Sequence, residues 1–168
     1  MTSLSDLELK GKRVLVRVDF NVPMEGTAIT DDTRIRAAIP TICAITEAGG
    51  RAILMSHLGR PKGGPDQKYS LRPVAAHLGT LLGQEVRFTE TTTGEAARAA
   101  VDSLPESGVL VLENTRFLPG EEKNDEALSR DLATLADVYV NDASGQLIAH
   151  TPRPRVWRGS CPRWRWAC

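Results

Sequence analysis

The chain alternates short runs rich in β-branched residues with longer amphipathic stretches, and this alternation restricts the folds open to it. The short runs predict strands at 13–18, 52–55, 85–88, 109–112 and 137–140. The longer stretches have helical spacing and lie at about 33–48, 71–82, 93–101 and 124–135. Strands separated by helices are typical of βαβ units with a parallel sheet. We therefore expect an α/β fold, a Rossmann-like three-layer domain with a mainly parallel sheet flanked by helices.

Residues at the ends of the helical stretches support these boundaries. Residues 31–33 (Asp-Asp-Thr) can cap the first helix, and Gly49 and Gly50 can end it. Pro40 is expected to kink its early part. Ser70 opens the next helix, with Pro73 in its first turn.

Composition and cysteine use narrow the class of protein. Apolar residues make up 41% of the chain and charged residues 25%, as in soluble globular proteins. No apolar run approaches the ~20 residues of a membrane span, and the polar residues 1–12 do not resemble a signal peptide. Cysteines at 43, 161 and 168 form neither a metal-binding spacing nor an even disulfide set. We expect a cytoplasmic protein with no membrane partner and no metal site.

The segment 144–168 differs from the rest of the chain. It holds five arginines, no lysine and no acidic residue, together with all three tryptophans and two of the three cysteines. Without those five arginines, 16 basic residues face 21 acidic ones, a net charge of −5 for residues 1–143. A mildly acidic domain gives no reason to expect a nucleic-acid partner.

Polar residues that follow the predicted strands indicate a ligand site, because open α/β sheets bind ligands at the carboxyl ends of their strands. Arg34, in the first turn of the first helix, joins the residues that follow four of the strands. The guanidinium groups of arginines form paired hydrogen bonds with phosphate and carboxylate oxygens. The side chains of Asp19 and Asn21 can hold hydroxyl groups or orient the arginines. The pattern predicts a site for a small, multiply anionic metabolite with a hydroxyl group. The residues that follow strands are Asp19, Asn21, His57, Arg60, Asn114, Thr115, Arg116, Asn141 and Asp142.

Each of these residues alone has a plainer reading. A single arginine at a strand end is more often part of a surface ion pair, and His77, on a helix, is expected to pack or to lie at the surface. The glycine-rich segment 58–64 lacks both the GxxxxGK[ST] and the GxGxxG pattern, and no Ser-His-Asp or Cys-His grouping is evident. Their joint placement favours a site, and periodicity by itself leads to an anion-binding α/β domain.

The same segments resemble phosphoglycerate kinase. The resemblance rests on motifs that keep the family's order and spacing throughout residues 1–143. The motifs are RVDFNVP at 17–23, DTRIRAAIPTI at 32–42, SHLGRP at 56–61, LENTRF at 112–117, GEEKND at 120–125 and ADVYVNDA at 136–143.

The resemblance implies reversible phosphoryl transfer in glycolysis between 1,3-bisphosphoglycerate and Mg-ADP, giving 3-phosphoglycerate and Mg-ATP. In that family the N-terminal domain binds the glycerate and the C-terminal domain binds the nucleotide. A hinge closes the two domains, and the full-length enzymes are monomeric. We expect no nucleotide site in the present chain.

The resemblance also assigns roles to residues of this chain. Asp19 and Asn21 would hold the hydroxyl and carboxylate region of the glycerate, in a substrate-binding set that also includes Phe20, Leu58 and Gly59. Arg34 would be the catalytic residue, since it would neutralise charge on the phosphoryl group in flight. The basic patch around phosphate and carboxylate would consist of His57, Arg60 and Arg116.

The resemblance stops after Ala143. The family continues with a stretch like FGTAHRAHAS, whereas this chain has SGQLIAHTPR at 144–153. The latter can be written TCG GGA CAG CTC ATC GCG CAC ACG CCT CGA. One T placed in front turns it into codons for Phe-Gly-Thr-Ala-His-Arg-Ala-His-Ala-Ser. We infer a frameshift at or near the Ala143/Ser144 junction, which also accounts for the Arg, Pro, Trp and Cys content of the segment.

This inference divides the chain into an incomplete phosphoglycerate kinase N-terminal domain at 1–143 and an out-of-frame tail at 144–168. The tail lacks the apolar period of a helix or strand, so we expect it to be irregular and disordered. The fragment is then expected to be inactive alone. The alternatives are a non-catalytic remnant that binds 3-phosphoglycerate, a pseudogene product, or a tail that binds nucleic acid or membrane through Arg and Trp.

Overall fold

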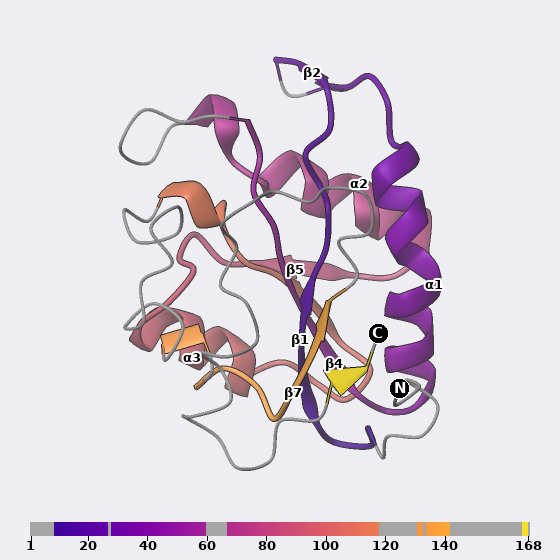
Figure 1. The fold of residues 1–168 in the computed structure, drawn as a ribbon, viewed down its shortest axis with the longest axis vertical. Helices are drawn as coiled ribbons and strands as arrows, with labels where there is room; N and C mark the ends of the chain where they lie inside the picture. The colour runs from indigo at the N-terminus through magenta and orange to yellow at the C-terminus, as the bar shows by residue number, and fades with distance from the viewer. Residues whose placement is uncertain are drawn as a thin grey trace.

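A parallel sheet forms the centre of the protein (Figure 1). The computed structural model describes residues 9–26, 28–59, 67–117, 131–132, 134–141 and 166–167. Within these residues the strand order is β5-β6-β4-β1-β7-β8, and every adjacent pair is parallel. The strands are β1 (Arg13–Arg17), β4 (Arg51–Met55), β5 (Val86–Phe88), β6 (Val109–Val111), β7 (Val138–Asn141) and β8 (Trp166–Ala167).

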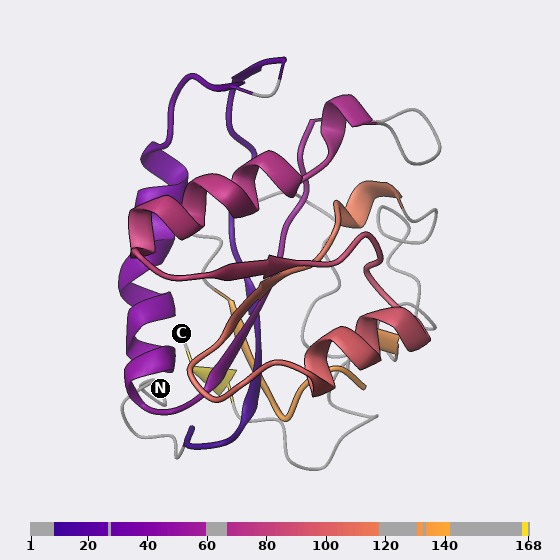
Figure 2. The ribbon, with the colours of Figure 1, turned by 180° about the vertical axis from the view of Figure 1, so that it is seen from behind.

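Helices cover both faces of this sheet, as Figures 1 and 2 show from opposite sides. Alternate strand residues face opposite layers because side chains alternate along a strand. Val14 and Val16 of β1 pack in one apolar cluster with α1 (Thr33–Glu47) and α2 (Arg72–Leu82). Leu15, between them, belongs to a second cluster with α3 (Glu95–Asp102). The expected three-layer α/β architecture is confirmed.

The strands and helices expected from the sequence lie within one or two residues of the observed bounds wherever the structure describes them. Of the expected helix at 124–135, only residues 131–132 and 134–135 are described, and Asp131 and Leu132 are helical. Two features differ from expectation. The turn-rich segment after β1 continues into an antiparallel hairpin of β2 (Met24–Glu25) and β3 (Ala28–Ile29), whose Met24 and Ile29 pack against the core. The other is β8, in the segment expected to be irregular, where Trp166 and Ala167 pair with β7.

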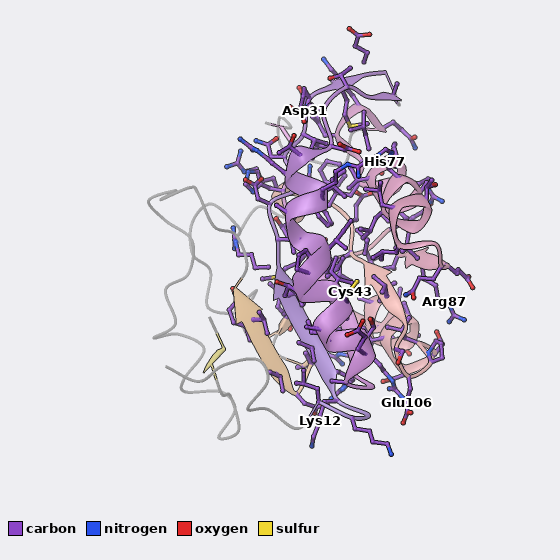
Figure 3. The ribbon with its side chains drawn as sticks, turned by 90° about the vertical axis from the view of Figure 1, so that its right-hand side faces the viewer. Lys12, Asp31, Cys43, His77, Arg87 and Glu106 are labelled. Atoms are coloured by element: carbon purple, nitrogen blue, oxygen red, sulfur yellow. The ribbon has the colours of Figure 1, made fainter. Side chains whose placement is uncertain are left out.

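The start of α1 is organised differently from a simple side-chain cap. Asp31 Oδ1 accepts a hydrogen bond from the Thr33 N–H at 2.9 Å. Asp32 occupies the N-cap position, but its carboxylate makes no cap bond and binds Arg36 at 3.0 Å and His77 Nε2 at 2.9 Å. His77 belongs to α2, so this pair ties the two helices together at the end marked by the Asp31 and His77 labels of Figure 3.

In the described ranges, none of the helices is long and apolar enough to cross a bilayer.

Candidate functional site

Three loops meet where β1, β4 and β6 end, toward the top of Figure 1. Ser56, directly after β4, joins them. Its Oγ accepts a hydrogen bond from the Phe20 N–H at 2.9 Å, and its carbonyl accepts one from the Thr115 N–H at 3.1 Å. The Thr115 hydroxyl donates to the same carbonyl at 3.1 Å. Ser56 is buried, so these bonds are shielded from water and hold the loops in one arrangement.

Arg34 reaches this edge from the first turn of α1. Its Nη1 lies 3.3 Å from Asp19 Oδ2 and donates to the Asn21 carbonyl at 2.9 Å. Asn21 in turn uses its side-chain Oδ1 to accept from the Gly59 N–H at 3.0 Å. Asp19 therefore orients Arg34, as the sequence suggested, and Asn21 joins the loop after β1 to the loop after β4.

Arg116 approaches from the loop after β6. It lies in the short 3-10 helix η3 (Thr115–Phe117), and its Nη1 donates to the Gly59 carbonyl at 3.0 Å. Its backbone N–H donates to Asn114 Oδ1, also at 3.0 Å. Arg34 and Arg116 thus contact neighbouring parts of the same edge, since Asn21 and Gly59 are hydrogen-bonded to each other.

His57 is nearly buried beside these arginines. Burial is the main cause that lowers its pKa to about 4; the positive charges of Arg116, Arg17 and Arg34 act in the same direction, and Asp19 opposes them. The imidazole is therefore neutral at pH 7. The positive charge of the site comes from the arginines, and an arriving anion would relieve the repulsion that helps to keep His57 uncharged.

The remaining predicted residues fall into three groups. The side chains of Phe20 and Leu58 lie in the core, so any contact with a ligand would come from their backbone. Gly59 has a positive φ of 62°, and a Cβ there would overlap the ring of Tyr69. Arg60 and Asp142 lie outside the described residues, as does the side chain of Asn141.

The sequence reasoning missed several residues that build the site. Arg17, at the end of β1, is close enough to affect His57. The Glu113 carboxylate accepts from the Leu71 N–H at 2.9 Å, the Asn114 N–H at 2.8 Å and the Ser70 hydroxyl at 2.8 Å. The available signal was a charged residue at or just after the end of an apolar strand, which Arg17 and Glu113 share.

The chemistry available here is that of anion binding. The guanidinium groups can form paired hydrogen bonds with phosphate or carboxylate oxygens, and Asp19 can accept from a hydroxyl. Among the described residues no group of three or more His, Cys, Asp and Glu side chains could hold a metal ion.

Comparison with protein families gives one clear match. The profile described as "Phosphoglycerate kinase" matches residues 4–152. Curated phosphoglycerate kinases of Fervidobacterium nodosum and Rubrobacter xylanophilus are 56% and 57% identical to the chain over 143 residues. Each alignment covers 85% of this chain and 36% of the relative. The chain therefore spans little more than a third of the length of these relatives.

Solved structures give the same picture. Phosphoglycerate kinase from Pyrococcus horikoshii OT3 superimposes with a TM-score of 0.85 at 30% identity, covering 99% of this chain and 42% of that one. The structure of phosphoglycerate kinase from Coxiella burnetii gives a TM-score of 0.75 at 36% identity, covering 84% of this chain and 35% of that one.

Proposed function

The chain belongs to the phosphoglycerate kinase family, and from that premise we propose that its sheet edge is the glycerate-binding half of such an enzyme. The ligand would be 3-phosphoglycerate or 1,3-bisphosphoglycerate. The observation that carries this proposal is the grouping of Arg34 and Arg116 around the buried, neutral His57. A ligand with two anionic ends and a hydroxyl matches two separate guanidinium groups and an adjacent carboxylate.

The proposed roles follow from position. Asp19 and Asn21 would bind the hydroxyl and carboxylate region of the glycerate. This part of the ligand would lie against the backbone of residues 19–21, next to Gly59. His57, Arg60 and Arg116 would form the basic patch. Asp19 holds Arg34, whose side chain is about half exposed to solvent. Arg34 could therefore exchange its contact with Asp19 for a contact with the phosphoryl group that is transferred. Phosphoryl transfer needs mainly positioning and charge stabilisation, which suits an arginine.

We further propose that this chain alone does not complete the reaction. Full-length relatives use Mg-ADP or Mg-ATP, and the share of their length spanned here is 36%. A chain that carries the glycerate half without a nucleotide site would bind the ligand and transfer nothing. A binding remnant is therefore the second candidate function.

The proposed frameshift fits the extent of the similarity. The family profile ends at residue 152, inside the segment 144–168, and the alignments with the two relatives cover 85% of this chain. Sequencing the DNA across the codons for 142–145 tests this proposal. One additional T would show that the encoded protein continues in frame, and an unchanged reading would leave the 168-residue chain as the encoded product.

Binding of 3-phosphoglycerate to the purified chain tests the site itself, by calorimetry at millimolar ligand. A chain that shows no binding would contradict the proposed site.

Arg34→Ala tests the catalytic role in an enzyme with the reading frame restored. It should lower the turnover number about a hundredfold or more and weaken 3-phosphoglycerate binding much less, because Arg34 is proposed to meet the phosphoryl group in flight. The matched control is Arg36→Ala, two positions along α1, whose side chain pairs with Asp32. Equal turnover of the two variants would contradict the proposed role of Arg34.

The same substitutions in the present chain separate catalysis from stability. The Arg34–Asp19 pair is partly exposed to solvent, so Arg34→Ala should change the free energy of unfolding by less than about 1 kcal/mol. Urea unfolding of the two variants checks that a loss of turnover does not come from a loss of structure.

A further inference from the structure

Asn114 occupies an unusual position behind the site. It follows β6 and is fully buried, with 0% of its surface exposed. Its Nδ2 donates to the Leu58 carbonyl at 2.7 Å and to the Tyr69 carbonyl at 2.9 Å. Its Oδ1 accepts from the Arg116 N–H at 3.0 Å. Both Nδ2 protons and the Oδ1 atom are therefore in use.

These bonds close a ring. Asn114 holds Leu58, the next residue is Gly59, and the Gly59 carbonyl accepts from Arg116 Nη1 at 3.0 Å. The backbone of Arg116 returns to Asn114. The ring sets the distance between the Arg116 guanidinium and the turn that carries His57, and the bond to Tyr69 attaches the 3-10 helix η2 (Gln67–Tyr69) to the same point.

Only a carboxamide of this length meets the requirements of the position. Two carbonyls need donors and one N–H needs an acceptor. An aspartate carboxylate would place negative charge against both carbonyls, and an apolar side chain would remove all three hydrogen bonds, one of them buried and two partly buried. A buried amide that satisfies all of its hydrogen bonds in this way defines one arrangement of the groups around it.

We propose that Asn114 is a positioning residue of the anion site, which acts by fixing Arg116 relative to the turn at 57–59. The inference rests on the proposed function for the identity of the ligand, 3-phosphoglycerate. It does not require Asn114 to touch that ligand.

The test compares Asn114→Ala with a control that removes a similar buried hydrogen bond nearby. Thr92 is also buried, and its hydroxyl donates to the Glu113 backbone carbonyl at 3.0 Å, so Thr92→Val removes one buried bond to the same loop and leaves the ring of Asn114, Leu58, Gly59 and Arg116 intact. Thr92→Val and Asn114→Ala should both lower the unfolding midpoint. Two further readouts separate them: the dissociation constant for 3-phosphoglycerate by calorimetry, and the titration of the His57 ring by NMR.

We expect Asn114→Ala to weaken 3-phosphoglycerate binding about tenfold or more, because misplacement of an anchoring group by its supporting partner has effects of this size. The pKa of His57, about 4 in the parent chain, should move toward 6.5 as the turn loosens and water reaches the ring. Thr92→Val should change neither quantity.

The outcomes divide clearly. An Asn114→Ala chain with parental affinity and parental His57 titration overturns the proposal, and so does a Thr92→Val chain that shows the same losses. If the parent chain does not bind 3-phosphoglycerate, the proposed function fails. The His57 titration alone then tests whether Asn114 fixes the turn at 57–59. If Asn114→Ala does not fold, Asn114→Ser replaces it, since its hydroxyl can still accept from the Arg116 N–H.

Discussion

His57 illustrates how burial changes the chemistry of one side chain. A histidine beside three arginines suggests a cationic patch, yet burial and these neighbours lower its pKa to about 4. The ring is therefore neutral at pH 7. Its folded pKa lies below the ordinary value of 6.5, so the unfolded chain takes up this proton first as the pH falls.

Stability should consequently depend on pH in a defined window. The contribution of neutral His57 is complete above about pH 6.5 and is lost as the pH falls toward 4, since the unfolded state binds more protons in that range. Urea unfolding between about pH 4.5 and 7 measures this slope. His57→Asn should flatten it, and an unchanged slope in that variant would show that other groups are responsible. The lowered pKa values of Asp31, Asp32 and Asp137 place their titration below this window.

Gly59 is the other residue whose identity the site requires. It has a φ of +62°, and a Cβ would overlap the Tyr69 ring. Gly83, at the end of α2, has a φ of +68°, and a Cβ added there would meet no atom within 4 Å. Both alanine variants incur the left-handed cost of about 1 kcal/mol.

Gly59→Ala should therefore destabilise the chain by about 1–3 kcal/mol more than Gly83→Ala, because overlap with a packed ring forces neighbouring groups to move. Only Gly59→Ala should also weaken 3-phosphoglycerate binding. Denaturant unfolding and calorimetry of the pair test this, and equal losses of stability would show that the Tyr69 ring moves aside at no cost.

The helix α2 is held at its start by a residue that lies 42 positions away in sequence. Leu71, at the N-cap, has no side-chain cap, and its N–H donates to Glu113 Oε1 at 2.9 Å. The Ser70 hydroxyl donates to the same carboxylate at 2.8 Å. A negative charge at a helix N-terminus is also favourable toward the helix dipole. Glu113 thus links the start of α2 to the loop that carries Asn114 and Arg116.

Glu113→Ala should destabilise the chain by about 2–3 kcal/mol, because it leaves buried N–H groups without acceptors. Glu113→Gln should cost much less, since its Oε1 can still accept from the Leu71 and Asn114 N–H groups and its amide can donate to Ser70. Thermal or urea unfolding gives both values. Equal destabilisation by the two variants would mean that the charge of Glu113, and not its acceptor geometry, supports α2.

At the scale of the whole molecule, the proposed function predicts the activity of the 168 residues alone. We expect the purified chain to form no ATP from 1,3-bisphosphoglycerate and Mg-ADP, because it spans 36% of the length of its curated relatives. A gene with the reading frame restored should give an active enzyme in the same coupled assay. ATP formation above background by the 168-residue chain would contradict the proposal that this chain alone does not complete the reaction.

The order of elements followed from local pattern. Apolar runs with β-branched residues and stretches with helical spacing predicted the α/β class, and buried Val14, Leu15 and Val16 show the reason. A central parallel strand is covered on both faces, so its three middle residues are all apolar. Asp19, Asn21, His57 and Arg116 were predicted as site residues because they lie in the segments that follow strands. The short hairpin of β2 and β3 was missed, since two-residue strands carry no readable period.

The partners of the polar side chains depended on distant parts of the chain. His77 meets Asp32 across 45 positions, Glu113 meets Leu71 across 42, and Asn114 meets Leu58 across 56. Periodicity indicates which face of an element is buried, because residues three or four positions apart in a helix, or two apart in a strand, lie on the same face. It carries no information about which loops converge at a sheet edge. The residue types and their order thus came from the sequence, whereas the neutral His57, the support of α2 by Glu113 and the ring around Asn114 arise only when the fold removes water from these groups.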